Sequence, residues 1–125
     1  MSNFLELALI AHQKGDLAEA AQLYKLHLGQ APRDVRATYG LGAISLLGGS
    51  LEGLGLIKES LLMPSDPNFD RVLAADSALA TLLSRQYREH ARLFLEELIG
   101  LGIQVPDFEA KLNALRIPAY LDVMA

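Results

Sequence analysis

The chain repeats its own pattern of apolar and small residues at an interval of 34 residues. Repetition at a fixed interval of this size is typical of stacked units that are each too small to bury an apolar face alone. A further shift of about 36 residues brings a weaker third copy into register. The matches over the first interval are Leu7 with Leu41, Ala8 with Gly42, Ile10 with Ile44, Gly15 with Gly49, Asp16 with Ser50, Leu17 with Leu51, Leu23 with Ile57 and Leu28 with Leu62.

Glycine and proline divide the chain into segments whose apolar residues recur every three or four positions. This is the periodicity of helices, and it leaves almost no place for strands. Hydrophobic residues make up 51% of the chain and aromatic residues 6%, with no Trp, which favours helices packed through aliphatic contacts. We predict helices over about 3–14, 16–28, 34–47, 50–63, 69–84, 87–99 and 107–115.

Local signals mark the ends and the weak points of these helices. Asp16 and Glu19 form a capping-box pattern, in which each side chain would accept a hydrogen bond from the other residue's backbone amide. Ser50 is the expected cap of the fourth helix. Gly53 and Gly55 lie inside that helix, where each costs up to about 1 kcal/mol relative to Ala. They either allow close approach to the third hairpin or make the second unit the least stable.

A helix–turn–helix unit of this length resembles the tetratricopeptide repeat family, whose pattern is W-x2-L-G-x2-Y, then A-x3-F, then P. The first unit is the best match, with Phe4, Leu7, Ala8, Ala11, Ala20, Tyr24 and Pro32 at these positions. The second unit keeps Leu41 and Gly42, but has Leu54, Lys58 and a late Pro67. The third unit has His90 or Ala91 at the small position, Phe94 at the aromatic position, and Arg85 in place of glycine.

The resemblance implies an all-α fold: a right-handed superhelical stack of three hairpins with a C-terminal capping helix. The hairpins would cover about 3–29, 34–63 and 69–99, and the cap 107–125, in a single domain over 1–125. Inside each hairpin, Ala8 or Gly42 on one helix would face Ala20 on the other. Small residues are needed there because large side chains would push the two helices apart.

In this family, the first helices of successive repeats line a concave groove that binds peptides or a partner's helix. On the family alignment the groove is mainly apolar and receives Leu5, Leu9, His12, Tyr39, Ala43, Leu46, Ala75, Leu79 and Leu82. A clamp for a terminal carboxylate is not expected, because Leu5 and Leu9 replace the Lys and Asn of such clamps. An apolar peptide or an amphipathic helix would suit the groove. Alternatively, a second copy or the chain's own apolar tail, with Tyr120, Leu121, Val123 and Met124, would fill it.

Charged residues suggest a second surface. Arg85, Arg88 and Arg92 lie at helical spacing, with His90 nearby, and could meet an acidic partner or a phosphate. Because Glu89 and Glu96 follow two of these arginines by four residues, ordinary ion pairs within a solvated helix are the alternative. Asp76 interrupts an apolar helix and would face either solvent or the groove.

Composition argues against several other functions. The net charge of −4 and the pI near 5.3 give no general attraction to nucleic acid or anionic membranes. The chain has no Cys, and its histidines show no metal-ligand spacing, so we expect no metal and no cofactor. No catalytic triad can be assigned. No signal peptide or membrane-spanning run is recognisable, and we expect a cytoplasmic protein.

The sequence therefore predicts a binding module, an adaptor or scaffold for another protein or peptide, and not an enzyme in itself. One alternative is a substrate-presenting part of a larger enzyme, because repeats similar to residues 12–20 precede bacterial O-linked protein glycosyltransferases. Another is a self-associating structural subunit, such as a homodimer. The identity of the partner, and whether the native chain continues past Ala125, stay open.

Overall fold

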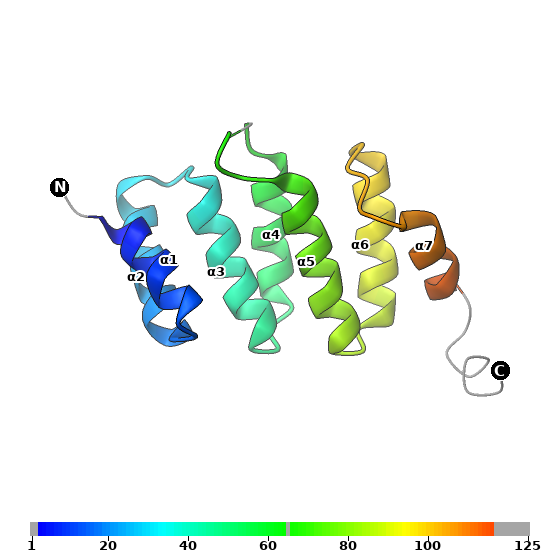
Figure 1. The fold of residues 1–125 in the computed structure, drawn as a ribbon, viewed down its shortest axis with the longest axis horizontal. Helices are drawn as coiled ribbons and strands as arrows, with labels where there is room; N and C mark the ends of the chain where they lie inside the picture. The colour runs from blue at the N-terminus through cyan, green and yellow to red at the C-terminus, as the bar shows by residue number, and fades with distance from the viewer. Residues whose placement is uncertain (1–2, 65, 117–125) are drawn as a thin grey trace. The chain divides into compact units, whose positions relative to one another are not determined.

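The structure, a computed structural model, describes residues 3–64 and 66–116. All regular secondary structure within these residues is α-helical, as predicted (Figure 1). Each helix boundary lies within two residues of the prediction. The helices are α1 (Phe4–Gln13), α2 (Leu17–Gln30), α3 (Val35–Leu47), α4 (Glu52–Leu62), α5 (Arg71–Ser84), α6 (Arg88–Gly100) and α7 (Phe108–Arg116).

The chain divides into two compact units, residues 1–70 and residues 71–125. In unit 1, α1 packs on α2, α2 on α3 and α3 on α4. In unit 2, α5 packs on α6 and α6 on α7. Within unit 1, α1 with α2 and α3 with α4 form antiparallel hairpins, and α5 with α6 does so within unit 2 (Figure 1). No helix among the described residues is long and apolar enough to cross a bilayer. The tail residues Tyr120, Leu121, Val123 and Met124, one of the alternative occupants of the groove, lie outside the described residues.

The 34-residue interval corresponds to a repeated turn. Gly15 has a positive φ of 83°, and the Asp16 amide donates to the Ala11 carbonyl at 2.9 Å, which is a Schellman ending for α1. Gly49 ends α3 in the same way, with a φ of 92°. The Asp16 side chain accepts from the Glu19 amide at 3.3 Å and so caps α2 as predicted. The reciprocal half of the capping box is wrong, because the Asp16 amide is already bonded to Ala11.

The third copy of this turn is built without glycine. Gln86 has a positive φ of 63°, and the amide of Tyr87 donates to the Leu82 carbonyl at 2.9 Å. Gln86, and not Arg85, therefore stands at the glycine position. The one-residue error arose because the sequence shift of about 36 was matched to side chains, whereas the turn is defined by its backbone.

Small residues set the distance between the helices of each hairpin. Ala8 and Ala20 are fully buried in the first hairpin beside Tyr24. In the second hairpin Gly42 faces Gly53 and not Ala20: a Cβ on Gly42 would lie 2.7 Å from the Gly53 carbonyl oxygen. Gly53 thus permits a close approach within its own hairpin, not to the third one.

This contact corrects the alignment of the second unit. Gly53 and Ile57 have the same four-residue spacing as Ala20 and Tyr24, and Ile57 is fully buried. They take the small and aromatic positions that the alignment gave to Leu54 and Lys58.

The third hairpin has the same arrangement in unit 2. Ala91 and Leu95 lie four residues apart in α6 and are both fully buried, with Phe94 buried beside them. Of the two candidates for the small position, the structure selects Ala91, because His90 is exposed. Small residues thus stand at the helix contacts of all three hairpins.

Candidate functional site

The nine predicted groove residues divide into a buried group and a partly exposed group. A side chain without exposed area can support a binding surface but cannot contact a partner. The buried group, each at most 1% exposed, consists of Leu46, Ala75, Leu79 and Leu82. The partly exposed group lies entirely in unit 1 and consists of Leu5, Leu9, His12, Tyr39 and Ala43.

His12 is held in the contact between α1 and α2. Its Nδ1 lies 2.9 Å from the hydroxyl of the buried Tyr24, and the two rings meet edge to face with centroids 5.8 Å apart. Burial lowers the pKa of His12 and raises the pKa of Tyr24. Both groups are therefore held in their neutral forms, and His12 serves mainly to join two helices.

Tyr39 contacts a segment that sequence reasoning missed. Phe69, which follows α4, packs edge to face on Tyr39 with ring centroids 5.5 Å apart. A turn positions it, because the amide of Phe69 donates to the Asp66 carbonyl at 3.0 Å. Asp66 also accepts from the Asn68 amide at 2.8 Å. The chain's own linker thus takes part of the contact area of Tyr39.

Leu5 and Leu9 line a hollow of about 450 Å³ in unit 1. They lie one turn apart on α1, so both side chains belong to one apolar face. The structure therefore brings together two of the predicted groove residues and adds polar neighbours from the other helices. The hollow is lined by Asn3, Leu5, Glu6, Leu9, His27 and Arg36.

One polar wall of the hollow is fixed by Asp34, the N-cap of α3. Its Oδ1 accepts from the Ala37 amide at 3.0 Å, and its Oδ2 lies 3.0 Å from Nε2 of His27. Burial alone would raise the pKa of Asp34. Hydrogen bonds from Ala37 and His27, with the charges of His27 and Arg36, outweigh burial and hold this pKa below its ordinary value. An ionised Asp34 therefore orients the His27 ring from α2.

Two buried polar atoms belong to residues of this hollow. Nδ1 of His27 and Nε of Arg36 have no hydrogen-bond partner among the described residues. An unsatisfied buried polar atom costs about 1–3 kcal/mol, and both atoms lie behind the wall of the hollow and not on its surface. No sequence pattern marks Arg36 as a site residue, and the spacing of His27 from the other histidines indicates no metal site.

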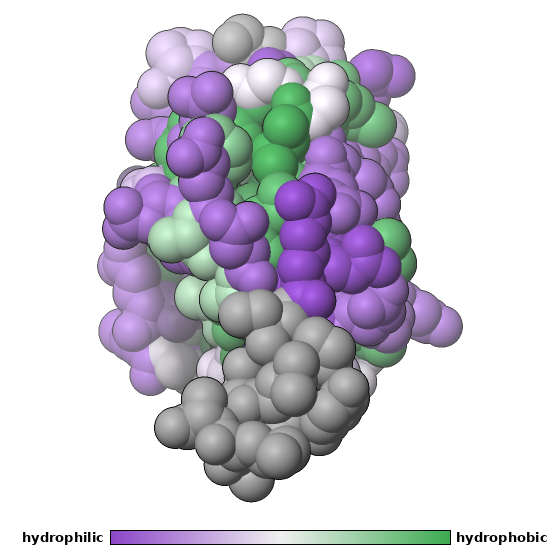
Figure 2. All heavy atoms as spheres, turned by 90° about the vertical axis from the view of Figure 1, so that its right-hand side faces the viewer, coloured by the Kyte–Doolittle hydropathy of each residue, from purple (hydrophilic) through white to green (hydrophobic). Residues whose placement is uncertain are grey.

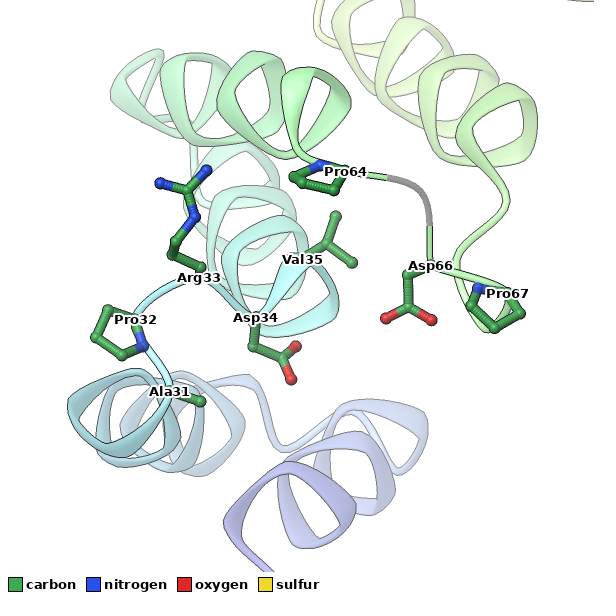
Figure 3. A pocket seen from close by; sticks show the side chains of 8 residues that line it. All are labelled: Ala31, Pro32, Arg33, Asp34, Val35, Pro64, Asp66 and Pro67. Carbon is green, nitrogen blue, oxygen red and sulfur yellow. The ribbon is translucent and has the colours of Figure 1, made fainter.

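A larger cavity of about 800 Å³ lies at the loops of unit 1 (Figure 3). In Figure 3 the Arg33 side chain extends away from the carboxylates of Asp34 and Asp66. Both carboxylates bond backbone amides of their own loops, as described above. The cavity is therefore formed mainly by loop residues, and its two carboxylates are already engaged. Its lining consists of Ala31, Pro32, Arg33, Asp34, Val35, Pro64, Asp66 and Pro67.

The arginine surface is largely engaged within unit 2. Arg92 pairs with Glu89 and, at 3.2 Å, with Glu96. The hydrogen bond from Arg92 lowers the pKa of Glu89. Arg88 donates to the Ala114 carbonyl at 3.0 Å and so helps to hold α7. Figure 2, which views the α7 side, shows hydrophilic residues flanking an apolar strip. These contacts favour ion pairs within the unit over an acidic partner.

Asp76 has a role that the sequence did not suggest. Its Oδ1 lies 2.9 Å from Nζ of Lys111, so the carboxylate joins α5 to α7. The partner follows 35 residues later in the chain, too far to be recognised by helical spacing. Asp76 therefore contributes to unit 2 itself.

The hollow at Leu5 and Leu9 is the best candidate site. Within residues 3–64 and 66–116, no three His, Cys, Asp or Glu residues are grouped so that they could hold a metal ion. Comparison of the chain with protein-family models, with curated protein sequences and with solved structures found no match.

Proposed function

We propose that the chain is a tetratricopeptide-like binding module that holds an apolar peptide or an amphipathic helix of a partner protein at Leu5 and Leu9. The observation that carries the proposal is the hollow of about 450 Å³, where this leucine pair lies beside His27 and Arg36. Ligand sites are typically concave and mostly apolar, with a few polar groups that fix orientation, and have volumes of about 300–1,000 Å³.

The energetics suit such a role. A partner leucine or phenylalanine buried against Leu5 and Leu9 would contribute roughly 1.5–3 kcal/mol. Arg36 is of the residue type that most often dominates the energy of protein interfaces, together with Trp and Tyr.

The repeated backbone features support the proposed architecture. A right-handed superhelical stack needs equivalent units, and the turns at Gly15, Gly49 and Gln86 are equivalent in their positive φ and hydrogen bonds. Tyr39 lies under Phe69, so the proposed contact area is centred on α1.

Leu9→Arg tests the proposal. A library of apolar peptides would be selected against the full chain, and the affinity of a selected peptide measured by fluorescence anisotropy. We expect Leu9→Arg to weaken binding by about tenfold or more, because it places a charge in the apolar half of the hollow. Leu62→Arg is the control, since Leu62 is 66% exposed on α4. Failure to select any peptide, or equal binding by the Leu9→Arg variant, would refute the proposed function.

The two alternative roles make different predictions. A self-associating subunit would give a dimer in light scattering that Leu9→Arg dissociates. A substrate-presenting module of an O-linked protein glycosyltransferase would bind the acceptor protein at the same hollow, next to a catalytic domain in the same polypeptide. Neither alternative changes the residues that we propose to make the contact.

A further inference from the structure

The outward face of α1 carries two large apolar side chains that are about half exposed. Leu7 is 50% exposed and Ile10 is 44% exposed. They lie three residues apart and therefore on one side of the helix. Their counterparts one repeat later, Leu41 and Ile44 on α3, are partly buried and pack against the core of the first hairpin.

The equivalence of α1 and α3 rests on the backbone as well as on the sequence. Both helices end in a Schellman turn with a glycine at positive φ, at Gly15 and Gly49. Both use a buried small residue, Ala8 or Gly42, for the partner helix of their own hairpin. The side of α1 that bears Leu7 and Ile10 thus corresponds to the side of α3 that packs against the first hairpin.

Single exposed apolar residues are normal on protein surfaces. Leu7 and Ile10 differ because they occupy the two positions used for docking one repeat later. The positions one turn before and after the pair, Asn3 and Lys14, are polar and exposed. The outward face thus has an apolar centre with a polar rim, which is the pattern of an interface.

We propose that the face of α1 formed by Leu7 and Ile10 docks an amphipathic helix whose apolar face resembles that of α2. The choice of occupant follows from unit 1, where α2 packs on α3 and contributes the partly buried Leu23 and Leu28 to the same core. The proposed occupant therefore carries leucines at the edges of an apolar helix face, as α2 does. This surface is distinct from the hollow, because Leu5 and Leu9 lie on another side of α1.

The chain itself supplies the probe for a test. A fluorescent peptide of residues 17–30, with both ends blocked, would be titrated with the full chain and followed by anisotropy. We expect saturable binding that Leu7→Glu weakens by about tenfold or more. Leu93→Glu should bind normally, because Leu93 is 45% exposed but lies on α6. Leu9→Arg should also bind normally, which separates this surface from the hollow.

Two further measurements keep the test decisive if Leu7→Glu lowers the stability of the protein. A peptide carrying Leu23→Glu and Leu28→Glu should not bind the unchanged chain. In ¹⁵N-labelled protein, the unaltered peptide should shift the amide signals around Leu7 and Ile10 and leave those around Leu41 and Ile44 in place.

Several outcomes would overturn the proposal. These are the absence of peptide binding, equal binding by a well-folded Leu7→Glu variant, and signal shifts confined to the hollow. Shifts at Leu41 and Ile44 would mean that the peptide merely replaces α2 in its own hairpin. A dimer that Leu7→Glu dissociates, without peptide binding, would assign the face to a second copy of the chain instead.

Discussion

Gly53 and Gly55 lie two positions apart in α4 and have opposite effects on the fold. Gly53 is buried against the backbone of α3, where an added Cβ would lie 2.7 Å from the Leu46 amide nitrogen. Gly55 is exposed, and an added Cβ would meet nothing within 4 Å. Only the first glycine is required by packing. The second adds the flexibility of glycine to the helix and brings no contact in return.

Alanine substitutions should separate these roles. Gly53→Ala forces α3 and α4 apart and should lower the free energy of unfolding by about 1–3 kcal/mol. Gly55→Ala should raise it by up to about 1 kcal/mol, because alanine is the better helix former. Urea denaturation followed by circular dichroism measures both. If the two variants changed stability in the same direction, the proposed contact between Gly42 and Gly53 would be wrong.

His12 should make the stability of unit 1 depend on pH. Burial lowers its pKa in the folded chain, whereas the unfolded chain has the ordinary value of about 6.5. At a pH between the folded-state and unfolded-state pKa of His12, the unfolded chain binds more protons than the folded chain. The free energy of unfolding should therefore fall as pH drops below about 6.5. His12→Gln, which can still bond the Tyr24 hydroxyl, should flatten this slope. An unchanged slope from pH 7 to pH 5 in chemical denaturation would contradict this role of His12.

At the scale of elements, the turn between α5 and α6 is the strained copy of the helix-ending turn that the chain repeats. A left-handed backbone costs about 1–2 kcal/mol for a residue with a Cβ, and Gln86 bears this cost where Gly15 and Gly49 avoid it. The same hydrogen bonds close all three turns. The difference therefore lies in the residue and not in the shape of the turn.

Gln86→Gly should stabilise unit 2 by about 0.5–1.5 kcal/mol. The matched control is Ser84→Gly, two residues earlier at the end of α5, which should destabilise because glycine weakens a right-handed helix. Thermal unfolding of both variants tests the pair. A loss of stability in Gln86→Gly would show that the glutamine side chain makes a compensating contact.

The helices could be predicted from the sequence. The positions at which neighbouring helices contact each other could be predicted only in part. Glycine and proline end helices locally, so the helix bounds follow from nearby residues. Contacts between helices depend on where the next helix begins. The fourth helix meets its partner through Gly53 and Ile57, and a constant shift of 34 residues misses this by one position. The contact between Asp76 and Lys111 was missed for the same reason, because no local pattern connects α5 to α7.

At the scale of the whole molecule, α1 is the helix on which the proposed interactions converge. One side, with Ala8 and Ala11, is buried in unit 1. A second side, with Leu5 and Leu9, lines the hollow, and the outward side bears Leu7 and Ile10. A helix that is apolar nearly all round is usually buried on all sides. Two apolar sides of α1 are instead partly exposed, and each is proposed as a separate binding surface.

The sequence could identify the apolar half of the candidate site, because Leu5 and Leu9 share one helix and one face. It could not identify the polar half. His27 and Arg36 come from two other helices, and their approach depends on the cap at Asp34 and on how α2 packs against α3. Phe69 lies in a linker, where no helical periodicity indicates which way a side chain turns. These residues are brought together only by tertiary structure.

The close contact between Gly42 and Gly53 also restricts how this protein can vary. A larger residue at either position would press on the backbone of the facing helix, which cannot move away as a flexible side chain could. In related chains we therefore expect both positions to stay glycine, or to change only together with a wider spacing of α3 and α4. Gly55 should vary freely, even though it lies within one turn of the most restricted position in the helix.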